Sequence, residues 1–173
     1  MKKTVSLVLV LVLIAALGAV AQDKKAETAT NVKWFDPAHC DFCKNLIEDP
    51  HLMENMTYEF HDISNGCVSI TTVKPEYREA YQKAMDAMTK LAKEMEDGTR
   101  DPMDVKMDGS CQAYGMLQMA GAKVEYVQSD AADVMVMTSD NPETVKKIHE
   151  YAERNRAEMA IWKAEQTAKG AKE

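Results

Sequence analysis

The sequence predicts an α+β fold in which two tandem β-α-β-β-α ferredoxin-like halves form a pseudo-two-fold pair. Apolar and polar residues alternate in two pairs of short segments, a pattern typical of β-hairpins. Each pair is followed by a Pro-Glu dipeptide, at Pro75 and Pro142, which opens a long segment with helical spacing of its apolar residues. The two halves also align with each other, which favours a duplicated fold.

The repeat is visible residue by residue. Pro75 aligns with Pro142 at a shift of 67 residues, whereas Cys43 aligns with Cys111 at a shift of 68. One residue fewer in the second hairpin turn accounts for the difference. Two copies are too few for a solenoid, so we expect them to pack around a pseudo-two-fold axis.

Residues 32–98 are predicted to form the first half. Its expected elements are a strand at 32–35, a helix at 44–54, hairpin strands at 56–60 and 67–71, and a long helix that starts at 75. Gly66 belongs to a turn signal between the hairpin strands, and Gly98 ends the long helix. Pro50 is expected to bend or split the first helix.

The second half is predicted at residues 105–165, after a linker at 99–104. Its expected elements are a strand at 105–107, a short helix at 112–119, hairpin strands at 123–127 and 134–138, and a last helix from 141. We expect residues 166–173 to form a disordered tail. This order of elements repeats that of the first half.

Residues 1–21 are typical of a signal peptide. Lys2 and Lys3 precede an almost continuously apolar run at 5–17, and Ala19 and Ala21 occupy the positions that signal peptidase requires to be small. The run is short for a membrane span and polar sequence follows at once, although an uncleaved anchor is the alternative. We therefore expect an exported protein, periplasmic or extracellular, with a disordered leader at 22–31.

The net charge and the absence of several catalytic motifs narrow the range of possible functions. The net charge of −7 becomes −9 when the two signal-peptide lysines are lost, and no basic cluster remains for nucleic acid or for a membrane after cleavage. No nucleophile elbow, phosphate-binding glycine loop or zinc-protease helix is present. Whether the protein is an enzyme stays open, and a binding protein is favoured. Its expected partners are a metal ion and another exported protein.

The chemistry of the chain centres on the Cys-x-x-Cys formed by Cys40 and Cys43. Two thiols at this spacing near the start of a helix can chelate a soft metal or form a redox-active disulfide. Thiolate-rich sites favour copper or zinc over calcium or magnesium. The first hypothesis is therefore an exported protein that binds copper or zinc.

The predicted topology brings further ligands to the same end of the sheet. With right-handed crossovers, Cys67 at the start of a hairpin strand and His61 near the end of its neighbour would lie beside the Cys-x-x-Cys. His39 precedes Cys40 directly. The predicted metal ligands are Cys40, Cys43, Cys67, His39 and His61.

Two other functions stay open. The four cysteines allow three pairings, and a bridge between Cys67 and Cys111 would join the two halves. In one alternative the protein exchanges thiols and disulfides in the periplasm, with Cys40 as the attacking thiol. In the other it is a structural or partner-binding domain whose cysteines only form stabilising disulfides.

The order of elements in the first half resembles that of the heavy-metal-associated (HMA) domain, the ferredoxin-like module of copper and zinc chaperones and of metal-pumping ATPases. The resemblance implies that Cys40 and Cys43 are the two thiolate ligands. Ala38 stands where the family has Met, and Pro37 stands where it has Gly. The family's final strand is not evident in either half, so the resemblance covers the Cys-x-x-Cys and the order of elements.

Overall fold

The computed structural model describes residues 32–129 and 131–170, and the side chains among them up to residue 165. The predicted signal peptide at 1–21 and leader at 22–31 lie outside the described residues. The described chain is a mixed α/β structure with one four-stranded antiparallel sheet and three α-helices. None of the described helices is both long and apolar enough to cross a membrane.

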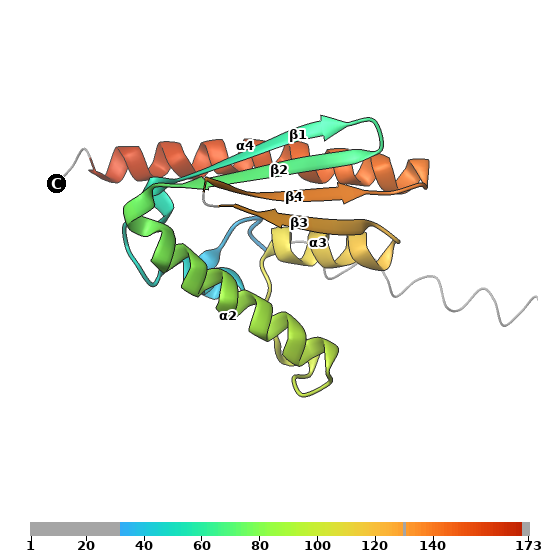
Figure 1. The fold of residues 1–173 in the computed structure, drawn as a ribbon, viewed down its shortest axis with the longest axis horizontal. Coiled ribbons are helices and arrows are strands. Elements are labelled where there is room, and N and C mark those ends of the chain that lie inside the picture. The colour runs from blue at the N-terminus through green and yellow to red at the C-terminus, as the bar shows by residue number, and fades with distance from the viewer. Residues whose placement is uncertain (1–31, 130, 171–173) are drawn as a thin grey trace, which may run out of the picture. The chain divides into compact units, whose positions relative to one another are not determined.

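The sheet consists of two hairpins that join along their inner strands (Figure 1). One hairpin is β1 (Met56–Ile63) and β2 (Gly66–Val73), and the other is β3 (Lys123–Gln128) and β4 (Ala132–Thr138). The strand order is β1-β2-β4-β3, and β2 pairs with β4 in antiparallel register, with Cys67 opposite Met137. Each half of the sequence therefore supplies one outer and one inner strand.

Gly66 permits the close contact between the two hairpins. A Cβ atom at this position would lie 1.9 Å from the carbonyl oxygen of Met137, so no larger residue fits without moving the backbone. The same glycine ends the tight turn predicted from the sequence. A single residue thus serves both the hairpin turn and the junction between the halves.

Each hairpin is followed by a long helix, as predicted. Helix α2 spans Arg78–Glu96 after a single 3-10 turn at Pro75–Tyr77, and Gly98 follows it with φ +71°. Helix α4 spans Pro142–Gly170, so it extends into the range expected to be a disordered tail. The short helix of the second half, α3, spans Gly109–Met119.

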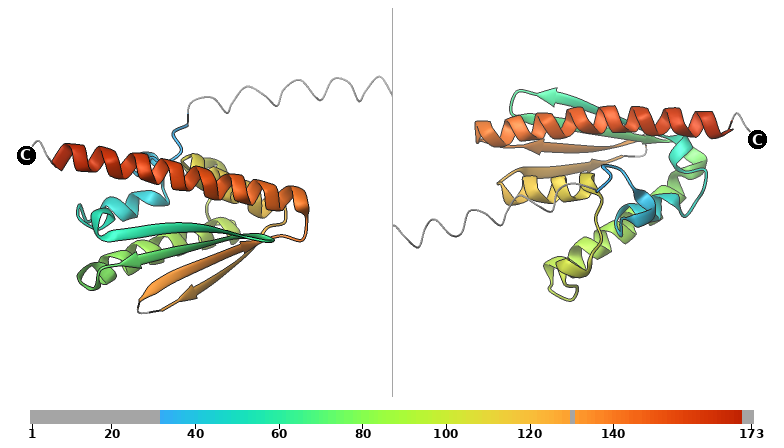
Figure 2. Two further views of the ribbon diagram at one scale, coloured as in Figure 1. Left: turned by 90° about the horizontal axis from the view of Figure 1, so that it is seen from above. Right: turned by 180° about the vertical axis from the view of Figure 1, so that it is seen from behind.

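Helices α3 and α4 cover one face of the sheet (Figure 2). Alternation along β2 turns Cys67, Ser69, Thr71 and Val73 toward this buried side. Two groups of buried side chains form the core. One lies around Leu52, Met56 and Tyr81, and the other consists of Cys67, Leu117, Met137, Ile148 and Ala152.

Three predicted elements are wrong. Residues 32–35 and 105–107 form no strands, and the helix expected at 44–54 is reduced to 3-10 turns at Cys43–Ile47 and Met53–Asn55. Pro50 accounts for the interrupted helix, because proline lacks the N–H donor that a helix interior requires. Without the leading strands, the tandem β-α-β-β-α arrangement is not shown, and the topology argument that placed Cys67 and His61 at the motif loses its basis.

Candidate metal centre

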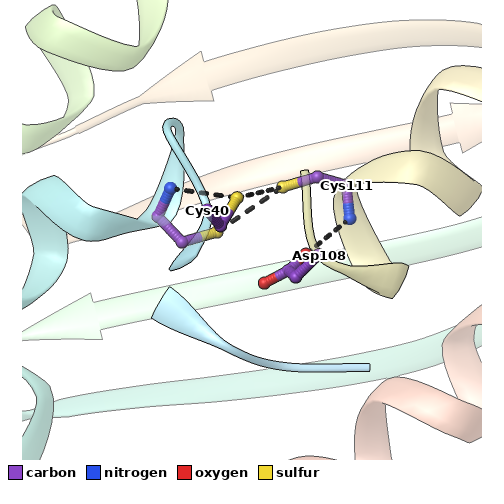
Figure 3. A group of neighbouring side chains, drawn as sticks. Cys40, Asp108 and Cys111 are labelled. Atoms are coloured by element: carbon purple, nitrogen blue, oxygen red, sulfur yellow. Dashed lines mark hydrogen bonds between the residues drawn. The ribbon is translucent and has the colours of Figure 1, made fainter. Parts of the chain in front are cut away.

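Three thiols and one carboxylate converge between the loop that carries Cys40 and the N-terminus of α3 (Figure 3). Ligand atoms of Cys40, Cys43, Asp108 and Cys111 all lie within 4.8 Å of one another. The Sγ atom of Cys111 is 3.5 Å from the Sγ atoms of both Cys40 and Cys43. We call these four residues the thiol–carboxylate cluster.

The Cys-x-x-Cys half of the cluster lies in a tight loop. Cys40 follows a 3-10 turn at Pro37–His39, and Cys43 begins the next turn at Cys43–Ile47. The backbone N–H of Cys43 donates to the Sγ atom of Cys40 at 3.4 Å. This hydrogen bond turns both thiols toward the same point and stabilises negative charge on Cys40.

The other half of the cluster is the N-terminus of α3. Asp108 is the N-cap residue, and its Oδ1 atom accepts a hydrogen bond from the N–H of Cys111 at 2.9 Å. Aspartate is among the best N-cap residues because its carboxylate satisfies an N–H group that the helix leaves unpaired. The cap fixes Asp108 and Cys111 relative to each other.

Main-chain hydrogen bonds hold the two halves of the cluster together. Gly109 and Ser110 donate to the carbonyl oxygens of Lys33 and Trp34, each at 2.9 Å. Gly109 permits this approach, since a Cβ atom there would lie 3.1 Å from the Cα atom of Trp34. The segments before the motif and before α3 are therefore neighbours, although they are not strands.

A second connection lies next to the cysteines. The N–H of Asp41 donates to the carbonyl oxygen of Lys106 at 2.8 Å, and the N–H of Lys106 donates to the Asp41 Oδ2 atom at 2.9 Å. The Asp36 N–H also donates to Asp108 Oδ2 at 3.2 Å. None of these hydrogen bonds involves a thiol. The two segments that carry the cysteines are therefore held together independently of the thiols.

The thiols differ in the direction of their pKa shifts. Hydrogen bonds with Cys111 and Cys43 lower the pKa of Cys40. Hydrogen bonding within the cluster raises the pKa values of Cys43 and Cys111. Burial raises the pKa of Asp108. These shifts favour ionisation of Cys40 over ionisation of Cys43 and Cys111.

The structure does not bring Cys67 into the cluster. Its side chain is fully buried among apolar residues of the second core group, including Leu117 and Met137. All four cysteines are free, so the Cys67–Cys111 bridge that the sequence left open as an alternative is not formed.

The two predicted histidine ligands also lie apart from the cluster. The His39 ring is 80% exposed and contacts the Asp36 carboxylate at 3.0 Å. His61 is exposed on β1, and its Nε2 atom lies 3.2 Å from a carboxylate oxygen of Glu59. Neither ring is among the ligand atoms gathered within 4.8 Å.

Two members of the cluster, Asp108 and Cys111, were not among the ligands predicted from the sequence. The internal repeat contains the missing signal, because a shift of 68 residues aligns Cys40 with Asp108 and Cys43 with Cys111. The second half therefore has Asp-x-x-Cys where the first half has Cys-x-x-Cys.

The arrangement is chemically suited to a soft metal ion. Three sulfur donors and one oxygen donor from two rigid segments match the donor types and number of a tetrahedral zinc site, and thiolates also bind Cu⁺. No protein-family model matches the chain, and no curated protein or solved structure is detectably similar to it. The assignment of the cluster as a candidate metal site therefore rests on this geometry.

Proposed function

We propose that this chain is an exported protein that binds one soft metal ion, copper or zinc, at the thiol–carboxylate cluster. The observation that carries the proposal is the convergence of three thiols from two segments 68 residues or more apart. Free cysteines are common in protein cores, but three whose Sγ atoms lie within 4.8 Å of one another beside a buried carboxylate are a typical metal-binding arrangement.

Metal would bind by replacing the protons of the thiols. Cys40 is 1% exposed, whereas Cys43 and Cys111 are partly exposed. An exported partner would therefore reach the metal through Cys43 and Cys111, and would take it or deliver it by ligand exchange. Export is supported by the basic, apolar and small-residue pattern of residues 1–21.

The proposal includes an origin of the fold by duplication. Both halves contain a hairpin followed by a long helix, and the two hairpins meet through β2 and β4. Cys40 and Asp108 occupy aligned positions, and each accepts a hydrogen bond from the N–H of the residue three positions later. These correspondences support a pseudo-two-fold pair of related halves, with the metal ligands at their junction.

Thiol–disulfide exchange is the second candidate function. The lowered pKa of Cys40 and the 3.5 Å contacts of Cys111 with both other thiols favour it. An attacking thiolate must also be accessible, and Cys40 is almost completely buried. This difference makes metal binding the better supported function.

The test measures the metal content and free thiols of the mature protein, purified anaerobically from the exported fraction. We expect about one equivalent of copper or zinc with reduced cysteines, in line with one closed site. Cys43→Ser should abolish binding, whereas Cys67→Ala, which removes a thiol outside the cluster, should preserve it. Unchanged affinity in Cys43→Ser would contradict the proposal. A disulfide that turns over with a small-molecule thiol, without bound metal, would favour the exchange function instead.

A further inference from the structure

Asp108 is a buried carboxylate that has no positively charged partner among the described side chains. It is 2% exposed, and both of its oxygens accept backbone hydrogen bonds, from Cys111 and from Asp36. Among the side chains that the structure describes, no Lys, Arg or His forms an ion pair with it. Buried carboxylates are usually paired with a cation or coordinate a metal.

The carboxylate retains capacity to bind a cation. A carboxylate has about four acceptor positions, and the two hydrogen bonds to Asp108 occupy one position on each oxygen. One of its oxygens belongs to the set of ligand atoms that lie within 4.8 Å of one another. A metal ion held by the three thiols would therefore also meet an oxygen ligand with a free lone pair.

The repeat gives an independent reason to regard Asp108 as a ligand. It occupies the position of Cys40 in the aligned half, and both residues hold the following cysteine by the same hydrogen bond. Each half thus supplies two potential ligands at the same spacing and with the same hydrogen bond between them, Cys40 with Cys43 and Asp108 with Cys111. Two such pairs make four donors, which is the number that a closed zinc site requires.

We infer that Asp108 is the fourth ligand of the site and determines its preference for a four-coordinate divalent ion, Zn²⁺, over Cu⁺. This inference rests on the proposed function. Zn²⁺ accepts carboxylate oxygen and thiolate sulfur together in tetrahedral geometry, whereas the softer Cu⁺ is selected by sulfur ligands. The carboxylate therefore contributes to Zn²⁺ binding and adds nothing for Cu⁺. In return, the bound divalent ion supplies the positive charge that Asp108 lacks.

The experiment compares Zn²⁺ and Cu⁺ affinities, by anaerobic competition with chelators, in the full mature chain and its variants. Asp108→Asn keeps an N-cap side chain but removes the negative charge, and Asp108→Ser keeps a cap that is too short to reach the metal. Asp101→Asn is the matched control, because Asp101 also caps a turn through its side chain but lies outside the cluster. Thermal unfolding of each metal-free variant checks that the fold is retained.

We expect Asp108→Asn and Asp108→Ser to lower the Zn²⁺ affinity by at least about tenfold, since even partners outside the ligand shell contribute this much. Their Cu⁺ affinity and that of Asp101→Asn should equal the wild-type value. Asp108→Cys restores the residue found at the aligned position and should retain divalent binding. With Co²⁺ as the probe, its sulfur-to-metal absorption should grow by about one third, because Co–S bonds increase from three to four.

The outcomes separate the two proposals. If the wild type binds Zn²⁺ and both Asp108→Asn and Asp108→Ser bind it equally well, Asp108 only caps α3. The inference is then wrong, while the proposed function stands. If Asp108→Cys shows no additional Co–S absorption, position 108 does not face the metal, and the inference is also wrong. If the wild type binds neither Zn²⁺ nor Cu⁺, the proposed function fails and the inference fails with it.

Discussion

Cys40 and Cys67 are equally buried, yet the pKa values of their thiols shift in opposite directions. Cys40 is 1% exposed and Cys67 is 0% exposed. Hydrogen bonds from neighbouring thiols lower the pKa of Cys40, whereas burial raises the pKa of Cys67 to about 11. Burial alone therefore does not distinguish a ligand from a core residue. The polarity of the immediate neighbours makes the difference.

The two thiols have different kinds of neighbours. Cys67 lies on the buried face of β2 and packs against apolar side chains such as Leu117, Met137 and Ile148. Cys40 lies in a loop that is hydrogen-bonded to the segment before α3, and its neighbours are thiols and a carboxylate. A cysteine among apolar groups behaves as a small hydrophobic residue, whereas a cysteine among hydrogen-bond donors is prepared to ionise.

Within the comparison of the cluster with the Cys67 site, the largest expected effect comes from removing Cys111, which contacts both Cys40 and Cys43. Cys111→Ser should lower metal affinity by at least roughly a hundredfold, since the 10–16 kcal/mol of a thiolate-rich zinc site is divided among four donors. Metal titration followed by competition with a chelator measures the loss. The control is Cys67→Ser, which should bind metal as the wild type does. Equal losses in both variants would show that Cys67 is not separate from the site.

The second prediction uses the pH dependence of folding. The folded state holds the Cys67 proton up to a pKa of about 11, whereas the thiol of an unfolded chain ionises near 8.5. The resulting stability is present below pH 8.5 and is lost as the pH rises through 11. Between these pH values the free energy of unfolding of the metal-free wild type should fall by up to about 3 kcal/mol more than that of Cys67→Ala.

Urea unfolding at several pH values, under reducing conditions, measures this difference. Tyrosines that are partly or fully buried, including Tyr58 and Tyr81, also have raised pKa values, but they are common to both proteins and cancel in the comparison. Parallel pH profiles for the wild type and Cys67→Ala would contradict the assignment of Cys67 to an apolar site.

The smallest expected effect is that of Cys67→Ala near neutral pH. Deleting one buried sulfur atom leaves a cavity of about the size of a methyl group, which typically costs about 1 kcal/mol of unfolding free energy. Urea unfolding of the metal-free protein measures the loss, and metal stoichiometry should not change. A lower stoichiometry in this variant would mean that Cys67 contributes to the site after all.

Local sequence patterns predicted the hairpins and the long helices. Alternation across residues 56–60, the turn at Gly66 and the proline at the start of the following helix are short-range signals that act within a few residues. The strand predicted at 32–35 does not form, because contacts with residues far along the chain decide its conformation. Its apolar residues pack elsewhere: Trp34 donates a hydrogen bond to Asn155, and Phe35 lies edge-on to Trp162.

The candidate site was predicted in part. Cys40 and Cys43 were expected from their spacing, and the structure places both in the cluster. The choice of Cys67 and His61 depended on a leading strand that does not form. Asp108 was missed because an N-cap aspartate before a helix is common, and it is distinguished by its alignment with Cys40 in the repeat and by its burial beside three thiols.

The sequence by itself determined the two hairpins, the long helices, the repeat that relates the halves and the Cys-x-x-Cys, because each depends on residues that are close in the chain or aligned by the repeat. Only the tertiary structure decided which thiols meet. Cys111 lies 68 residues from Cys43 and joins it through main-chain hydrogen bonds between irregular segments, for which no residue pattern is required. Cys67 lies only 24 residues from Cys43, yet its strand turns it into the apolar core. Distance along the chain does not predict these contacts, because packing of the sheet against α3 and α4 sets them.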